Sequence, residues 1–108
     1  MAVEMDVDEV CIRAYLSGDI DHHNAKELRN SIDNMVETTV PEVLVLDFGG
    51  VTFMDSSGIG LVMGRYKLMQ DLGGVVLIEN APKPIRKVLR LAGIEKMLEN
   101  QKKGEKPV

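Results

Sequence analysis

One short segment limits what this chain can fold into more than any other. Residues 43–48 form a nearly unbroken apolar run, with Pro41 before it and Gly49 and Gly50 after it. A strand with one face in water alternates apolar and polar residues, whereas a strand buried on both faces reads as a run of this kind. The segment therefore predicts a central strand of a layered sheet, and the two glycines are expected to end it.

Two half-buried strands are predicted before that segment. Apolar residues alternate with polar ones over residues 3–7 and 10–16, and Gly18 and Asp19 are expected to break the second strand. Asp21 then provides the N-cap of a helix over about residues 22–37. The apolar residues of this helix share one face, which is expected to cover the sheet: Ala25, Leu28, Ile32, Met35 and Val36.

The second half of the chain alternates between helix and strand. A helical stretch reaches about Leu72, residues 75–78 form another buried strand, and a third helix starts near Pro84 and ends at Gly93, before a short turn at 94–99. This order predicts an α/β fold with a mixed, mostly parallel sheet of four or five strands and three to four helices. The 108 residues suffice for one domain, placed at 1–100, with a polar C-terminal tail at 101–108.

The composition excludes several classes of protein. The net charge is -4, with 13 basic residues scattered among 17 acidic ones, which argues against a nucleic-acid binder. Cys11 is the single cysteine, so no disulfide forms within the chain, as expected in a reducing compartment. No segment is apolar over the roughly 18 residues of a membrane span, and the N-terminus lacks the pattern of a signal peptide. We therefore expect a soluble protein of the cytoplasm.

Two loops each follow a strand-like segment and precede a helix. They are residues 18–23, which contain two aspartates and two histidines, and residues 54–58, Met-Asp-Ser-Ser-Gly. In parallel sheets, binding residues gather in loops beyond the carboxyl ends of the strands, so these two loops are expected to form one site. Ser56 and Ser57 lie where the first N–H groups of a helix lack acceptors, and a serine oxygen there either caps the helix or serves a function.

The helix after these serines has an unusual composition. Gly60 and Gly64 lie one turn apart inside it, and each glycine costs about 1 kcal/mol relative to alanine. One stripe is the expected core face: Ile59, Val62, Met63, Tyr66 and Met69. The opposite side is smooth and partly apolar: Gly60, Leu61, Gly64, Leu68 and Leu72, with Arg65, Lys67 and Asp71 among them. Such a face either docks a partner or packs on another part of the same fold, and the sequence favours neither.

Catalytic and metal-binding alternatives have weaker support. A hydrolase would need His22 or His23 to activate Ser56, but the Gly-x-Ser-x-Gly pattern of a hydrolase nucleophile is absent. The same histidines beside Asp19 and Asp21 are explained more simply as solvated residues of a first helical turn than as metal ligands. We therefore predict neither a catalytic residue nor a metal site.

A dinucleotide loop is disfavoured by spacing. Gly58 and Gly60 follow a strand, but Gly64 comes one residue too late for Gly-x-Gly-x-x-Gly. The glycines of this segment therefore do not indicate a nucleotide cofactor.

Two motifs, taken in order, resemble one family. They are Gly-Asp-Ile-Asp-His-His-Asn-Ala at residues 18–25 and Phe-Met-Asp-Ser-Ser-Gly-Ile-Gly-Leu-Val-Met-Gly-Arg-Tyr-Lys at residues 53–67. Up to about Leu98 the chain is similar to the anti-sigma factor antagonists, whose domain is called STAS, and most of all to their sporulation branch.

This resemblance implies a phosphorylation-controlled regulator and not an enzyme. In the family, an anti-sigma factor that is also a serine kinase phosphorylates the first serine of Asp-Ser-Ser-Gly, here Ser56, and a serine phosphatase removes the phosphate. The unphosphorylated antagonist binds the nucleotide-loaded kinase and releases a sporulation sigma factor for transcription. ATP belongs to the kinase, so the antagonist needs no cofactor. The resemblance places these residues on the surface that faces the kinase: Asp21, Asp55, Ser57, Gly58, Leu61, Gly64 and Arg65.

Two other functions stay open at this point. One is a STAS module of another partner-switching pathway, such as the general stress response, which would have a different partner and the same chemistry. The other is a domain that binds a small ligand or nucleotide, which predicts saturable binding by the isolated chain.

Overall fold

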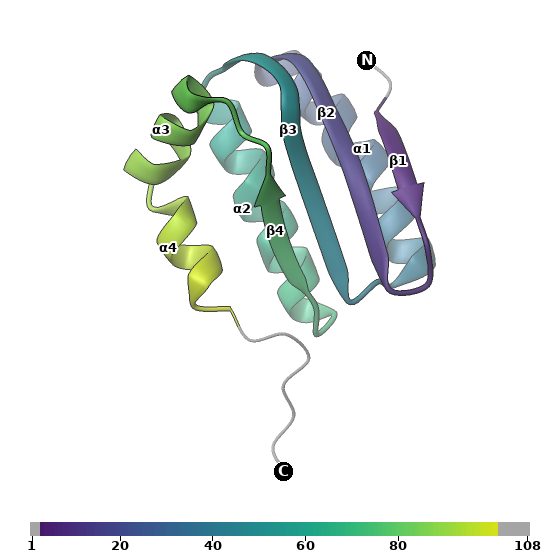
Figure 1. Ribbon diagram of the computed structural model, residues 1–108. Coiled ribbons are helices and arrows are strands. Elements are labelled where there is room, and N and C mark those ends of the chain that lie inside the picture. The colour runs from purple at the N-terminus through teal and green to yellow at the C-terminus, as the bar shows by residue number, and fades with distance from the viewer. Residues whose placement is uncertain (1–2, 102–108) are drawn as a thin grey trace.

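The computed structural model describes residues 3–101 and has the α/β architecture that the sequence predicts (Figure 1). The sheet has the order β1-β2-β3-β4, in which β1 is antiparallel to β2 and the other neighbouring strands are parallel. The strands are β1 (Glu4–Val7), β2 (Cys11–Ile20), β3 (Val43–Met54) and β4 (Val75–Glu79). The helices are α1 (His22–Thr39), α2 (Ser56–Asp71), α3 (Lys83–Leu91) and α4 (Ile94–Glu99).

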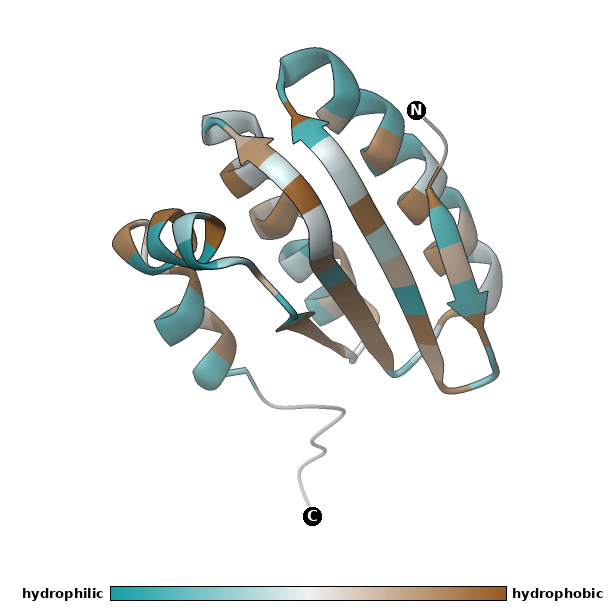
Figure 2. Cartoon of the chain, turned by 45° about the horizontal axis from the view of Figure 1, so that its top comes forward, coloured by the Kyte–Doolittle hydropathy of each residue, from teal (hydrophilic) through white to brown (hydrophobic). Residues whose placement is uncertain are grey.

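The helices divide into two groups around the sheet. Figure 1 shows α1 and α2 side by side on one face, with α3 and α4 beyond the β4 edge. The core lies mainly between the sheet and the first two helices, and it includes Leu28 and Ile32 of α1, Val62 and Met69 of α2, and Phe48 of β3. Figure 2 shows the first half of β3 as a hydrophobic band, which agrees with the predicted central strand.

One polar residue interrupts that band, and hydrogen bonds explain it. Asp47 is buried, and its carboxylate accepts from the Gly49 backbone N–H (2.9 Å), Asn80 Nδ2 (2.8 Å) and Arg13 Nη1 (3.1 Å). Burial alone would raise the pKa of Asp47, but these donors outweigh it and hold the pKa below its ordinary value. Asp47 therefore stays charged within the sheet.

Two expected strand ends are wrong. Gly49 and Gly50 do not end β3, which continues to Met54, and Gly18 and Asp19 do not break β2, which continues to Ile20. The register of the β2–β3 pairing shifts between Gly18 and Asp19, and Gly18 has a φ of 73°. The glycine therefore forms a β-bulge, and the two strands pair again beyond it. A Cβ at Gly50 would lie 2.9 Å from the Ser17 Cβ, so this glycine permits close pairing of β2 with β3.

The core face of α2 also differs from the prediction. Val62 and Met69 are buried as expected, but Met63 is 46% exposed. Leu61 and Arg65, expected on the opposite side, are only 4% and 6% exposed. The helix packs against α1 as well as against the sheet, and this second contact rotates the buried stripe toward Leu61 and Arg65.

The C-terminal part follows the expected order. Gly93 follows α3 with a φ of 78°, and α4 begins directly after it. Gln101, assigned above to the polar tail, lies against β4, where its side-chain amide accepts from the Val76 N–H (3.0 Å) and donates to the Val76 carbonyl oxygen. The rest of the predicted tail, 102–108, lies outside the described residues. None of the helices in residues 3–101 is long and apolar enough to cross a bilayer.

Candidate functional site

The two loops that the sequence singles out meet at one edge of the sheet. Ile20 and Met54 are partners at the carboxyl ends of β2 and β3, and an aspartate follows each of them. The backbone N–H of Asp55 donates to the carbonyl oxygen of Ile20 (3.2 Å), which joins the loops directly. The starts of α1 and α2 therefore lie next to each other, as the parallel topology predicts.

An aspartate side chain caps each of the two helices. Asp21 Oδ1 accepts from the Asn24 backbone N–H (2.9 Å), and Asp55 Oδ1 accepts from the Ser57 backbone N–H (2.8 Å). The predicted cap at Asp21 is confirmed. At the second helix the cap is Asp55 and not a serine, so capping does not explain why serines follow it.

Ser56 is the first residue of α2 and is exposed. No hydrogen bond from its hydroxyl is found within residues 3–101, so the oxygen is free to react or to be modified. Ser57 is partly buried and lies on the side of α2 that faces α1. The two serines therefore have different surroundings although they are adjacent.

Packing explains one of the three glycines of α2 and not the other two. A Cβ at Gly58 would lie 2.2 Å from Met54 Cγ and 2.3 Å from Met54 Sδ, so any side chain at Gly58 would force the buried Met54 to move. A Cβ at Gly60 or Gly64 would meet nothing within 4 Å. Packing within residues 3–101 therefore does not require glycine at these two positions, which leaves their helix cost unexplained by the fold.

A groove of about 610 Å³ runs between α1 and α2. Its walls come from the N-terminal parts of both helices: His22, Ala25, Lys26 and Arg29 of α1, and Ser57, Gly60, Leu61, Gly64 and Arg65 of α2. The groove brings together four of the predicted partner-facing residues, namely Ser57, Leu61, Gly64 and Arg65. Asp21, Asp55 and Gly58 belong to the helix starts beside it.

Three of the predicted surface positions need correction. Gly58, Leu61 and Arg65 are buried, because α1 and Met54 cover that side of α2. The sequence left open whether this side docks a partner or packs within the fold. In the structure Leu61 packs into the core, whereas Gly60 stays exposed and Gly64 partly exposed.

Arg65 is a charged residue that the sequence placed at the surface. Its Nε lies 2.8 Å from Asp33 Oδ1, and its Nη1 is buried without a hydrogen-bond acceptor within residues 3–101. Burial lowers the pKa of Arg65 and raises the pKa of Asp33, in each case against the attraction of the partner's charge. One carboxylate therefore does not fully compensate this buried guanidinium.

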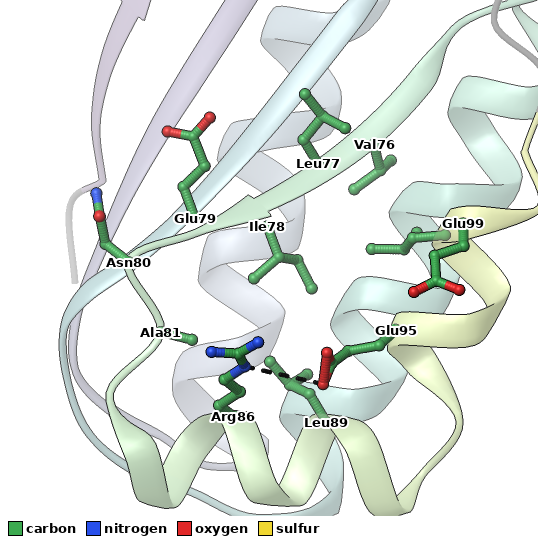
Figure 3. Close-up of a pocket in the computed structure, with 11 residues that line it drawn as sticks. Val76, Leu77, Ile78, Glu79, Asn80, Ala81, Arg86, Leu89, Glu95 and Glu99 are labelled. Carbon is green, nitrogen blue, oxygen red and sulfur yellow. Dashed lines mark ion pairs between the residues drawn. The ribbon is translucent and has the colours of Figure 1, made fainter.

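A second cavity lies elsewhere. It measures about 680 Å³ and lies between β4 and the pair α3 and α4, with Arg86 and Glu95 facing each other across it at 3.9 Å (Figure 3). None of the predicted site residues lines it.

The histidines that follow Asp21 are both exposed. His23 Nε2 lies 3.5 Å from Glu27 Oε1 one turn along α1, and His22 lines the groove. Within the described residues no three His, Cys, Asp or Glu side chains gather as metal ligands would. The pair therefore belongs to the first turn of α1 and its groove.

Known proteins are similar to this chain in sequence and in fold. The chain is 32% identical over 98 residues to the anti-sigma F factor antagonist of Paenibacillus polymyxa, which covers 91% of this chain and 84% of the relative. It is 26% identical over 107 residues to the anti-sigma-B factor antagonist of Bacillus subtilis, covering 97% and 96%. The solved structure of the anti-sigma factor antagonist SpoIIAA in its unphosphorylated form matches with a TM-score of 0.79 and 28% identity, over 88% of this chain and 84% of that one. The sequence profile of the STAS domain matches residues 2–105, and the chain therefore belongs to the STAS domain family.

Proposed function

We propose that this protein is an anti-sigma factor antagonist, a partner switch controlled by phosphorylation of Ser56. The observation that carries the proposal is the state of that serine. Ser56 begins α2 with an exposed hydroxyl, while Asp55 already caps the helix. The residue thus lies at a helix N-terminus without a structural role that would prevent its modification. Relatives named as anti-sigma factor antagonists, one of them solved in an unphosphorylated form, support the same conclusion.

The partner is an anti-sigma factor that is a serine kinase and binds with its nucleotide in place. Unphosphorylated protein occupies the kinase and releases a sporulation sigma factor, and a serine phosphatase restores this form after phosphorylation. The docking surface includes the start and the exposed side of α2, with Asp21, Asp55, Ser57 and Gly64. The buried residues Gly58, Leu61 and Arg65 shape this surface from beneath. The protein acts in the cytoplasm, contacts neither DNA nor membrane directly, and needs no cofactor of its own.

The charge of a phosphate explains how the switch works. A phosphate adds about -1.5 to -2 charges and three acceptor oxygens at neutral pH. The N-terminus of a helix accommodates negative charge, so the domain keeps its fold. In the centre of a docked surface the same charge is desolvated beside Asp55, which costs on the order of 2 to 5 kcal/mol, or roughly 30- to 4000-fold in affinity.

A related function differs only in the partner. The relative of Bacillus subtilis antagonises anti-sigma-B factor and aligns over nearly the whole chain, although at lower identity than the anti-sigma F relative. Recovery of the chain with its partner from native cells, and identification of that partner, distinguishes a sporulation pathway from a stress pathway.

Three variants test the phosphorylation site. Ser56→Ala should abolish phosphate incorporation by the purified kinase and ATP but retain binding, because removal of a hydroxyl adds no charge. Ser56→Asp should bind more weakly than Ser56→Ala and more tightly than the phosphorylated protein, because one carboxylate imitates only part of a phosphate.

Ser57→Ala is the matched control and should remain a substrate. Labelling and mass spectrometry measure incorporation, and calorimetry measures affinity. A phosphate located on Ser57 in the wild type, or full labelling of Ser56→Ala, would show that Ser56 is not the site.

A further inference from the structure

The charged side chains that line the groove between α1 and α2 are all basic, although the chain as a whole is acidic. The protein carries a net charge of -4, yet the ionisable side chains that line the groove are His22, Lys26, Arg29 and Arg65, and no acidic residue lines it. Lys26 and Arg29 are exposed on α1, whereas Arg65 lies at the base. A local basic surface on an acidic protein favours an acidic ligand.

The buried arginine adds an independent observation. Arg65 is 6% exposed, and its Nη1 has no acceptor within the described part of the chain. Its Nε forms an ion pair with Asp33 Oδ1 at 2.8 Å, but the geometry of this pair does not make a hydrogen bond. A guanidinium can bind a carboxylate through two parallel N–H groups, and here this capacity is unused. The charge of Arg65 is therefore only partly satisfied within the described residues.

We propose that this groove receives an acidic segment of the anti-sigma factor kinase, with Lys26 and Arg29 on its rim and Arg65 at its base. The inference rests on the proposed function and identifies the chemistry of the partner's contact. Gly60 and Gly64 form part of the α2 wall, and their lack of side chains lets the backbone of the incoming segment approach the helix. Lys26 and Arg29, the α1 residues of this contact, lie outside the serine-containing motif at residues 53–67.

The groove also offers a reason why the phosphate prevents docking. Ser57 lines the groove, and Ser56 precedes it at the same end of α2. A phosphate on Ser56 places negative charge at the mouth of the groove and opposes a segment of the same sign. The phosphate thus competes with the partner for one positive surface.

The experiment compares two charge reversals of equal size. Lys26→Glu with Arg29→Glu reverses the groove, and Lys87→Glu with Arg90→Glu reverses two exposed residues of α3. The first variant should bind the purified kinase at least tenfold more weakly at about 0.1 M salt, with a flatter salt dependence. The second should bind within about twofold of the wild type. Equal loss in both variants, or no loss in the first, would overturn the inference.

A variant of Arg65 tests the base of the groove. Arg65→Met should also bind at least tenfold more weakly, and it should lower the midpoint of thermal unfolding, because it leaves the carboxylate of Asp33 without its partner's charge. Unchanged binding by Arg65→Met would contradict the proposed contact. Should this variant fail to fold, the charge reversals on α1 decide alone, since both residues are exposed.

Three further outcomes are informative. Inorganic phosphate, compared with chloride at equal ionic strength, should not saturate the groove of the isolated chain in an NMR titration of the arginine Nε–H signals. Tight saturation would identify a site for free anions and would overturn the proposal that the groove binds a partner segment.

If the wild type binds no kinase at all, the proposed function fails together with this inference. If Ser56 switches binding normally and the groove variants bind like the wild type, only this inference fails.

Discussion

The two strand-to-helix junctions of this fold have the same framework and expose different residues. In both, a parallel strand ends beside its neighbour, an aspartate caps the next helix, and the cap accepts from a backbone N–H of the first turn. At the first junction, Asn24 also donates from its side chain to the Asp19 carbonyl oxygen (2.9 Å). At the second, the equivalent position is Gly58, which lies against Met54. The cap is therefore a general device, and the residues around it determine what each helix start can do.

The largest expected effect is at the position where the junctions differ most. Gly58→Ala should destabilise the protein by roughly 1–3 kcal/mol, because the new methyl group overlaps Met54, which is itself buried. Asn24→Ala, its counterpart on α1, removes only one exposed hydrogen bond and should cost about 0.5–1.5 kcal/mol. Unfolding in urea measures both.

A second substitution identifies the cause of the first effect. Met54→Ala creates space under Gly58, so the cost of Gly58→Ala should be smaller in the Met54→Ala background than in the wild type. Additive costs would show that the overlap with Met54 is not the reason for the glycine.

The caps themselves should behave alike. Asp21→Ala and Asp55→Ala each remove one acceptor from a first-turn N–H and should each cost about 0.5–2 kcal/mol, while the asparagine variants should retain most of the stability. Thermal unfolding provides the comparison. A much larger cost at Asp55 would mean that the second junction is structurally special beyond its exposed serine.

The smallest expected changes in stability are increases, in contrast to the losses predicted above. Gly60→Ala and Gly64→Ala should each stabilise the protein by about 0.5–1 kcal/mol, because the added methyl groups meet no atom within 4 Å and alanine favours helix. The same variants should bind the kinase several-fold more weakly if a segment approaches this wall closely. Stabilisation with unchanged binding would separate these glycines from the docking surface.

Much of the fold could be predicted from local patterns. The run at residues 43–48 predicted a buried strand, alternation predicted the strands before it, and Asp21 predicted the start of α1. The strand ends were missed because glycine usually ends a strand, whereas Gly18 adopts a bulge and Gly50 permits close pairing. A sequence does not show which strand approaches a glycine, so these positions required the structure.

The sequence predicted which loops form the site but not which side of α2 is buried beside it. The parallel topology was enough to bring the two loops together, but the buried side of α2 depends on where α1 packs. Leu61 and Met63 are both apolar, so periodicity alone fits either side. Arg65 was expected at the surface because the helix periodicity and the family resemblance place it away from the core stripe, whereas in the structure it is buried beside Asp33 of α1. The basic groove was also missed, because its charged residues come from two helices whose packing the sequence does not show.

The side chain of Gln101 has a consequence for how this protein behaves in concentrated solution. β4 is the last strand of the sheet, and such a strand presents main-chain groups that can template pairing with another molecule. The amide of Gln101 occupies both groups of Val76, much as a residue of a fifth strand would. A shortened chain that lacks Gln101 would uncover this position, and we expect it to self-associate at concentrations at which the intact chain stays dispersed.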